Sequence, residues 1–399
     1  MLIPDIASPT FKANPFEFYA RLRAVSPIQR VHITKRQDAW LLSRYDDALA
    51  MFKDDRLVKD KLNTRQPDDM TKEPWLPGFL KPLARNMLDV DVPDHTRLRS
   101  LVQKAFTPRL VEEMRGRIEE LAESLILSLR EKRSMELIHA FALPIPTTVI
   151  AEMLGVPIAD QHKFHRWSAS ITSADPTGWR MIMAIPQAVQ FLRYIRKLVQ
   201  TKREAPKDDL VSALVLAEEA GDKLNEDELV AMIFLLLVAG HETTVNLLGN
   251  GILSLLQHST ELDLLRNHSD LITSAVEELL RFNGPLDLST ERYARQDFGI
   301  HGQLVRRGDL VYASIASANR DERQFPNADA LQIQRTPNRH LAFGMGIHYC
   351  LGAPLARLEA QIAIPVLIRQ IPTLRLAPQA LRWRRSLNIR GLKRLILEW

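Results

Sequence analysis

Cys350 is the only cysteine among the 399 residues, and its neighbours follow the run Phe343-Gly344-Met345-Gly346-Ile347-His348-Tyr349-Cys350-Leu351-Gly352. An amphipathic pattern begins directly after it, which places the thiol at the N-terminus of a predicted helix. The helix dipole and nearby backbone N–H groups favour the thiolate there. A thiolate is a strong iron ligand, and as an axial ligand of a heme it favours O–O cleavage. A small buried hydrophobe is the usual role of a lone cysteine, so the surrounding residues must decide.

An acid and a threonine, Glu242 and Thr243, interrupt an apolar helical pattern in the run Ala239-Gly240-His241-Glu242-Thr243-Thr244. Threonine hydroxyls can bond back to the preceding turn, and a glycine inside a helix weakens it. Together they predict a local bulge with room for a small molecule or water. An acid beside it can bring a proton into a dry cavity. The alternative is a kinked core helix whose polar side faces outward.

Two charged pairs share helix faces by their spacing. Glu278 and Arg281 are three residues apart and can pair, although exposed helices often contain such pairs. His95 and Arg99 are four residues apart, and two cationic donors on one face suit an anionic partner such as a carboxylate. A solvated basic edge is the alternative for the second pair.

Hydrophobic periodicity predicts the elements that position these residues. We predict helices over 111–132, 185–203, 226–258 and 270–282, and shorter strands over 28–33, 39–43 and 310–314. The chain is therefore expected to be mainly α with a small β-rich lobe. Nothing resembling a repeat or linker interrupts the pattern, so we expect a single domain over residues 1–399. The segments 63–86 and 168–179 are predicted loops, either substrate entrances or ordinary surface connections.

Composition excludes several classes of protein. Apolar residues make up 46% and charged residues 25% of the chain, as in ordinary soluble domains. One cysteine excludes intramolecular disulfides and thiolate-rich zinc or iron–sulfur sites, and it favours the cytoplasm. Residues 1–9 do not resemble a signal peptide, and the apolar stretch 230–240 is shorter than the ~20 residues of a membrane span. We expect no membrane anchor. The net charge of +5 without a nucleic-acid module argues against nucleic-acid binding.

The run around Cys350 resembles the heme-binding signature of the cytochrome P450 superfamily, Phe-x-x-Gly-x-[His/Arg]-x-Cys-x-Gly, and fills it completely. The resemblance implies that Cys350 is the proximal ligand of heme b (iron protoporphyrin IX). It implies that Gly344 and Gly346 shape the loop under the iron and that Phe343 shields the sulfur. Gly352 would let the following helix approach the porphyrin closely, because a side chain there would collide with it.

The run 239–244 resembles the oxygen-activation motif of the same family, [Ala/Gly]-Gly-x-[Asp/Glu]-Thr-[Thr/Ser]. Carried over residue by residue, Thr243 would hydrogen-bond dioxygen and an ordered water, and Glu242 would relay protons from solvent. Ala239 and Gly240 would lie over the heme face. His241 occupies the variable position of the motif, which favours a structural or surface role.

Further positions match the family. Glu278 and Arg281 resemble its Glu-x-x-Arg motif, and Arg335 matches the arginine that completes a buried, structural ion-pair network. The positions expected to bind the heme propionates are His95, Arg99, Arg292 and His348. Val92 replaces one of the two prolines that the family usually shows after the aspartate, with little effect on this assignment.

The resemblance to the soluble bacterial branch implies the cytochrome P450 fold and a monomeric heme domain without a fused reductase. It implies a heme-thiolate monooxygenase that inserts one atom of dioxygen into a substrate by hydroxylation or epoxidation. Electrons would come from a ferredoxin and its NAD(P)H-dependent ferredoxin reductase, an acidic donor being steered by basic residues. The residues named for this steering are Arg97, Lys104, Arg109 and Arg357.

A hydrophobic small molecule is the expected substrate, because the candidate pocket walls are mainly apolar. These walls are 63–86, 168–179, Val238, 286–289 and 387–389. Three other functions use the same scaffold: a peroxide-driven enzyme, a heme-thiolate isomerase or dehydratase, and a non-enzymatic gas sensor. The pair Glu242 and Thr243 argues against the first, and the third predicts a signalling domain that the sequence does not show.

Overall fold

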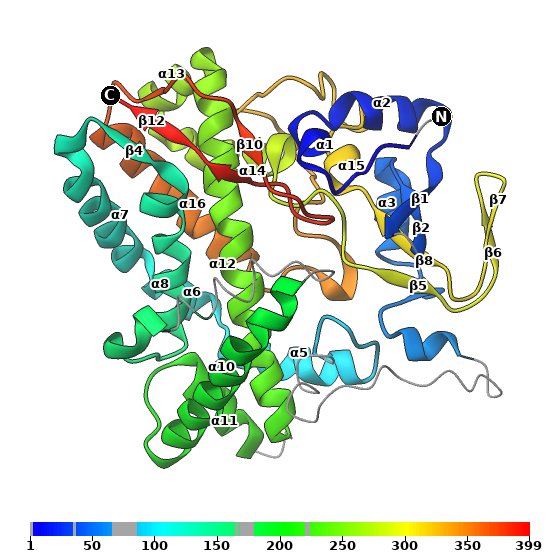
Figure 1. Cartoon of the computed structure of the whole chain (residues 1–399), viewed down its shortest axis with the longest axis horizontal. Coiled ribbons are helices and arrows are strands. Elements are labelled where there is room, and N and C mark those ends of the chain that lie inside the picture. Colours follow the sequence, from blue (N-terminus) through cyan, green and yellow to red (C-terminus); the bar gives the residue numbers. More distant parts are fainter. Residues whose placement is uncertain (1–2, 35–36, 66–85, 164–166, 168–178, 220–223) are drawn as a thin grey trace. The chain divides into compact units, whose positions relative to one another are not determined.

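The computed structural model describes residues 3–34, 37–65, 86–163, 167, 179–219 and 224–399. The predicted loops 63–86 and 168–179 lie almost wholly outside the described residues. The α-helices are α1 (Pro9–Ala13), α2 (Phe16–Val25), α3 (Tyr45–Met51), α5 (Asp94–Ala105), α6 (Pro108–Glu113), α7 (Arg115–Leu129), α8 (Pro144–Met153), α10 (Trp179–Glu204), α11 (Leu210–Glu219), α12 (Glu226–Gln257), α13 (Ser259–Asn267), α14 (Ile272–Asn283), α15 (Ile315–Ala318) and α16 (Ala353–Gln370). Figure 1 shows them.

The predicted helices are present with shifted ends. The segment 111–132 is divided between α6, α7 and a 3₁₀ turn at Arg130–Lys132. The segment 185–203 lies inside the longer α10. Side-chain caps explain two helix starts: Ser8 accepts a hydrogen bond from the Phe11 N–H at 3.2 Å, and Thr107 accepts one from Leu110 at 3.2 Å. Proline follows each cap, where its missing N–H costs nothing.

Among the described residues, the strands form one mixed sheet and three smaller ones. The larger sheet has the order β1-β2-β8-β5-β3, with β2 and β8 parallel and the other pairs antiparallel. Its strands are β1 (Ile28–Thr34), β2 (Gln37–Leu42), β3 (Leu57–Val58), β5 (Arg292–Ala294) and β8 (Leu310–Ala313). The others are β4 (Ser134–Glu136), β6 (Phe298–Ile300), β7 (Gln303–Val305), β9 (Arg375–Leu376), β10 (Arg382–Trp383), β11 (Leu392–Arg394) and β12 (Ile396–Glu398). The prediction of a mainly α chain with a small β portion is confirmed.

Strand periodicity explains why both faces of the larger sheet are buried. Along β2, Trp40 and Leu42 pack into one hydrophobic cluster, whereas Ala39 and Leu41 pack into another. Successive side chains point to opposite faces, so a continuous apolar run covers both. The second cluster includes the ring of Phe11, which lies 5.5 Å from that of Tyr19 in a T-shaped arrangement. The sheet is thereby fixed to α1 and α2.

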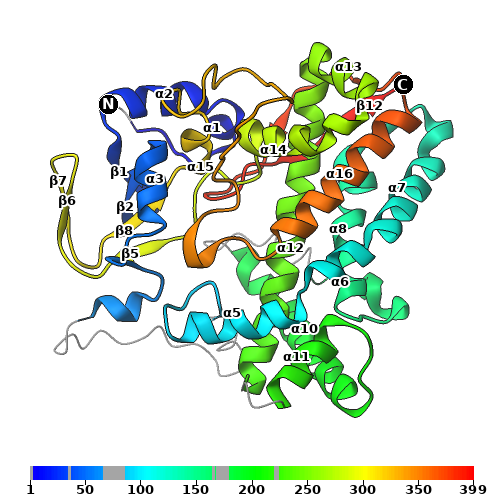
Figure 2. The same ribbon diagram turned by 180° about the vertical axis from the view of Figure 1, so that it is seen from behind.

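The chain divides into two compact units. The first comprises Met1–Asp69, Ile118–Leu143 and Thr243–Trp399, and it contains every strand named above. The second comprises Met70–Arg117 and Pro144–Glu242, where α11 packs on α10 and α5. Within the first unit, α16 packs against α13 and α14 (Figure 2). The expectation of a single domain stays a prediction.

Helix α12 is long and apolar enough, by length and composition, to cross a membrane, with a mean hydropathy of 1.6 in its most apolar window. It is the only such helix in the described part of the chain. The apolar stretch 230–240 is only part of this helix, which continues to Gln257. Half of the window is buried in the protein, as in a core helix.

Candidate active site

The loop before Cys350 depends on two glycines. Gly344 and Gly346 have φ values of +68° and +74°, which side chains rarely adopt. A Cβ on Gly346 would also lie 2.8 Å from the backbone oxygen of Phe52. The loop closes where the Cys350 N–H donates a 2.9 Å hydrogen bond to the Phe343 carbonyl. Cys350 itself is exposed, three residues before α16 begins.

Gly352 differs from the loop glycines. Its φ is −79°, and a Cβ built on it would meet nothing within 4 Å in the described part of the protein. The protein's own packing therefore does not require a glycine at this position. His348 is the last residue of the short 3₁₀ turn Gly346–His348, two residues before Cys350.

The run 239–244 lies in the middle of α12. Ala239 is exposed, Gly240 and Thr243 are half-buried, and their spacing of three and four residues places them on one helix face. Glu242 is half-buried too. The residues from Thr244 to Asn250 are buried, so the accessible patch at the centre of the helix ends at Thr243. This face presents small side chains and one hydroxyl group.

One expectation for this run is corrected, and the expectation for His241 agrees with the structure. The helix is continuous α-helix from Glu226 to Gln257, so the bulge predicted near Thr243 is absent. The i to i+4 backbone hydrogen bonds of the helix continue through Gly240, because packing on the buried faces of α12 stabilises it. His241 is buried, and its Nδ1 lies 2.9 Å from the Leu237 carbonyl oxygen, so its role is structural.

The predicted pairing of Glu278 with Arg281 is confirmed. Two hydrogen bonds of 2.7 and 2.8 Å join the carboxylate to the Arg281 guanidinium, and both side chains are fully buried. Arg335 adds bonds of 3.1 and 3.2 Å to the same carboxylate. Arg281 also donates to the carbonyls of Asn319 and Ala328. The network joins α14 to the segment that leads to the cysteine loop.

Next to the network around Glu278 lies a second network, which could not be predicted from the sequence. Glu277 accepts hydrogen bonds of 2.7 and 2.8 Å from Arg357, and His340 lies 3.1 Å away. Burial alone would raise the pKa of Glu277, but the bonds from Arg357 and His340 outweigh it and lower this pKa to about 2. The only signal in the sequence was the second acid beside Glu278. Arg357, which is expected to help steer a donor, is partly exposed and pairs with Glu277, and its steering role stays a prediction.

Two other steering candidates, Arg97 and Arg109, are also paired. Arg97 donates to Glu228, 3.3 Å from Nη1 to Oε2, and Arg109 donates to Glu113 at 2.8 Å. Each pair partly neutralises its positive charge, although an exposed pair contributes little to stability. The basic surface is therefore weaker than the sequence predicts.

The four positions predicted to bind propionates are placed as follows. His95 is buried and Arg99 is half-buried, one turn apart on α5 in the second unit. Arg292 is buried in β5 of the first unit, where it donates to the Leu57 carbonyl at 3.1 Å. His348 belongs to the first unit as well. Their role toward a heme stays a prediction.

Two of the predicted pocket walls do lie together. Leu286 and Ile389 form an antiparallel bridge, and the N–H of Asp287 donates to the Asn388 carbonyl at 2.7 Å. The Asp287 carboxylate is fully buried behind this bridge, where it accepts a hydrogen bond from Tyr19 at 2.6 Å and pairs with Lys12. Segments just over one hundred residues apart thus form one fixed wall. Val238 is half-buried on α12.

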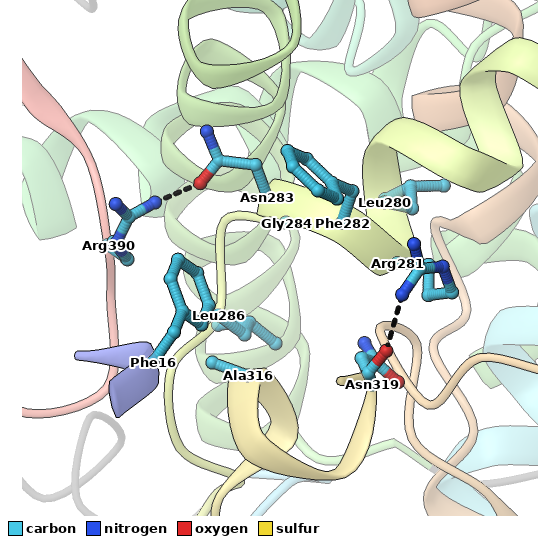
Figure 3. Close-up of a pocket in the computed structure, with 10 residues that line it drawn as sticks. All are labelled: Phe16, Leu280, Arg281, Phe282, Asn283, Gly284, Leu286, Ala316, Asn319 and Arg390. Atoms are coloured by element: carbon cyan, nitrogen blue, oxygen red, sulfur yellow. Dashed lines mark hydrogen bonds between the residues drawn. The ribbon is translucent and has the colours of Figure 1, made fainter. Parts of the chain in front are cut away.

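Figure 3 shows a small pocket behind this wall. Its free volume is about 10 Å³, enough for one water molecule. The lining residues are Phe16, Leu280, Arg281, Phe282, Asn283, Gly284, Leu286, Ala316, Asn319 and Arg390. None of the residues predicted to bind heme is among them, so this pocket is not the candidate active site.

Comparisons with known proteins agree with these features. The cytochrome P450 family model matches residues 179–372. The polyketide biosynthesis cytochrome P450 PksS of Bacillus subtilis is 43% identical over 390 residues, which cover 96% of each chain. The cytochrome P450 monooxygenase PikC of Streptomyces venezuelae is 41% identical, covering 98% of this chain and 92% of PikC.

Solved structures show the same likeness. The structure of PksS superposes with a TM-score of 0.91 and 42% identity, covering 100% of this chain and 99% of PksS. A structure of P450BioI with an acyl carrier protein that carries hexadec-9Z-enoic acid gives a TM-score of 0.87 at 39% identity, covering 98% and 100%. The fold is therefore the cytochrome P450 fold. The chain belongs to the cytochrome P450 family, as a bacterial-type monooxygenase whose cofactor is heme b.

Proposed function

We propose that Cys350 would be the thiolate ligand that holds heme b, and that Glu242 and Thr243 would hold and move the protons that the reaction needs. The observation that carries this proposal is the exposed thiol beside Gly352, a glycine that the protein's own packing does not require. A planar group lying against this position would explain the glycine. The residues present therefore fit a porphyrin. When bound, the heme supplies dioxygen activation for the insertion of one oxygen atom.

The chain's own residues have defined tasks in this scheme. Ala239 and Gly240 are small enough to leave space over the cofactor, and Thr243 presents a hydroxyl on the same helix face. Its hydroxyl would hold an ordered water, and the half-buried carboxyl of Glu242 would exchange protons with solvent. His95, Arg99, Arg292 and His348 would hold the propionates through charge-assisted hydrogen bonds. Phe343 and Gly344 would cover the sulfur.

The substrate we propose is a hydrophobic small molecule that is hydroxylated or epoxidised. The wall formed by the bridge of Leu286 with Ile389 supports this, because apolar walls suit such ligands. The relatives' names point the same way: PksS is named for polyketide biosynthesis, and the P450BioI structure holds a fatty acyl group on a carrier protein. A carrier-bound substrate is therefore included in the test below.

We propose a ferredoxin and its NAD(P)H-dependent ferredoxin reductase as the electron donors, and a cytoplasmic monomer as the working form. The likeness to the bacterial cytochrome P450 PksS along 96% of the given sequence supports separate donor proteins. The bacterial relatives and the lone cysteine support the cytoplasm. No observation favours an isomerase, dehydratase or gas sensor.

Titration of the ferric protein with hydrophobic compounds tests the substrate class. Fatty acids, terpenoids, steroids, macrolide precursors and an acyl carrier protein bearing a fatty acyl group form the panel. A blue shift of the Soret band with one class would identify it, and turnover with surrogate ferredoxin partners would follow. Binding only of polar compounds would contradict the proposal.

A further inference from the structure

Two side chains from separate segments, Arg357 and His340, meet at the carboxylate of Glu277 in the first unit. Glu277 on α14 accepts two hydrogen bonds from Arg357 on α16, with Nε and Nη2 at 2.7 and 2.8 Å. The His340 Nε2 atom lies 3.1 Å from the same carboxylate. The His340 side chain is 3% exposed. A bidentate guanidinium fixes its partner's geometry more strictly than a single bond does.

His340 also contacts the backbone that leads to the cysteine loop. Its Nδ1 accepts a 3.2 Å hydrogen bond from the Ala342 N–H, so Nδ1 carries no proton and the Nε2 proton is donated to Glu277. Ala342 directly precedes Phe343, the residue expected to shield the sulfur. The imidazole therefore joins a charged carboxylate to the start of the loop.

Arg357 contacts the loop at two further points. Its guanidinium carbon lies 4.4 Å from the ring centroid of Phe343, and its Nη1 donates to the Tyr349 hydroxyl at 3.2 Å. The rings of Phe343 and Tyr349 are 6.4 Å apart. Tyr349 precedes Cys350, whose N–H donates to the Phe343 carbonyl. Arg357 thus contacts residues on both sides of the hydrogen bond that closes the loop.

We propose that Glu277, Arg357 and His340 are positioning residues that set the geometry of the Cys350 loop and thereby the electron donation of its sulfur to the heme iron. The inference rests on the proposed function, in which Cys350 is the axial ligand. Groups outside the first ligand shell orient a ligand and tune the metal, and their loss commonly costs 10–100-fold in affinity or activity. None of the three touches the reacting atoms in this scheme.

Charge alone does not account for this role. Glu277 and Arg357 carry opposite charges within hydrogen-bond distance, so their fields largely cancel at a distance. What remains is the cation–π contact with Phe343 and the bonds to Tyr349 and the carboxylate. Lysine preserves the charge of Arg357 but lacks the planar fork that pairs with a carboxylate through two parallel bonds. The variant Arg357→Lys therefore separates geometry from charge.

The test uses the heme-loaded enzyme with Arg357→Lys, Glu277→Gln and two changes at His340. Arg369→Lys is the matched control, because Arg369 lies on the same helix and pairs with Glu123 on the surface at 3.1 Å. The readouts are the reduction potential of the heme iron, the share of the reduced CO complex that keeps thiolate ligation, and the rate of heme transfer to excess apomyoglobin.

We expect Arg357→Lys and Glu277→Gln to shift the reduction potential, to lower the thiolate-ligated share and to release heme about 10-fold faster or more. His340→Leu should do the same, whereas His340→Gln should restore wild-type behaviour because an amide can both donate and accept. Arg369→Lys should leave all three readouts unchanged.

The inference would be overturned if Arg357→Lys and His340→Leu both kept the wild-type reduction potential, CO spectrum and rate of heme release. Should one variant fail to fold, the pair His340→Leu and His340→Gln still decides it. A wild-type protein without a thiolate-type CO spectrum would instead refute the proposed function, so the two failures are distinguishable.

Discussion

The carboxylate of Glu278 and the guanidinium of Arg281 face each other one turn apart in α14, with both side chains fully excluded from solvent. Removal of one partner would leave the other charge buried and uncompensated. We predict that Arg281→Gln lowers the free energy of unfolding by about 3–5 kcal/mol. Urea unfolding of the heme-loaded protein measures this change.

Arg266 supplies the control for that experiment. It pairs with Asp263 at 2.9 Å on the surface of α13, also with a spacing of three residues. We expect Arg266→Gln to cost at most about 1 kcal/mol, because exposed pairs contribute little. Equal losses in the two variants would show that the α14 pair behaves as a surface pair.

A second prediction concerns pH and Glu359 on α16. This side chain is buried, and neither carboxyl oxygen has a hydrogen-bond partner of ordinary geometry among the described residues. Burial raises the pKa of Glu359 to about 8 from 4.5, while the Thr244 hydroxyl opposes the shift. The folded state therefore holds a proton that the unfolded state has lost between these pH values.

The difference between the pKa of Glu359 in the folded and unfolded states sets the direction in which stability changes with pH. The contribution of Glu359 to stability is full below pH 4.5 and falls by up to about 1.4 kcal/mol per pH unit as pH rises toward 8. Glu359→Gln should remove this slope and unfold at higher urea than wild type at pH 8. Glu131→Gln, at an exposed position, should not. Parallel pH profiles for wild type and Glu359→Gln would refute the prediction.

A third prediction separates two glycines of the same signature. Gly346→Ala should destabilise the protein by about 1–3 kcal/mol with or without heme, because φ is +74° and a Cβ would meet the Phe52 oxygen. Gly352→Ala should leave the melting temperature of the heme-free protein unchanged and weaken heme binding. Calorimetry and heme titration measure the two effects. Unaltered heme affinity in Gly352→Ala would contradict the placement of the porphyrin.

The motifs with local geometry could be predicted from the sequence. Glu278 and Arg281 pair because a three-residue spacing on a helix dictates it, and the glycines of the cysteine loop have the positive φ that their residue type indicates. Strand positions such as Trp40 and Leu41 could be predicted from the short apolar run that contains them. These features depend on neighbours within a few positions along the chain.

Long-range partners could not be predicted. Arg357 and Glu277 lie 80 residues apart, and no periodicity relates α16 to α14. Lys12 reaches Asp287 across 275 residues to fix the wall behind Leu286. Their pairing depends on which helix faces meet in the folded chain. The sequence also overestimated the distortion near Thr243, because packing on the buried faces of α12 keeps the helix continuous.

A fourth prediction concerns the hydroxyl of Thr243. Thr243→Ala should consume NAD(P)H at a rate close to wild type while product per electron pair falls about 10-fold or more and hydrogen peroxide accumulates. The hydroxyl is the polar group on the accessible face that can hold a proton-donating water. Thr243→Ser keeps it and should restore coupling. If Thr243→Ala formed as much product per electron pair as the wild type, Thr243 would have no part in proton delivery.

The absorption spectrum of the reduced CO complex, compared between wild type and Cys350→Ser, tests the central claim most directly. The chain contains one cysteine, so thiolate ligation has no other source. The account predicts a thiolate-type Soret band in the wild type and its complete loss in Cys350→Ser with heme still bound. A wild-type complex without that band would contradict the account.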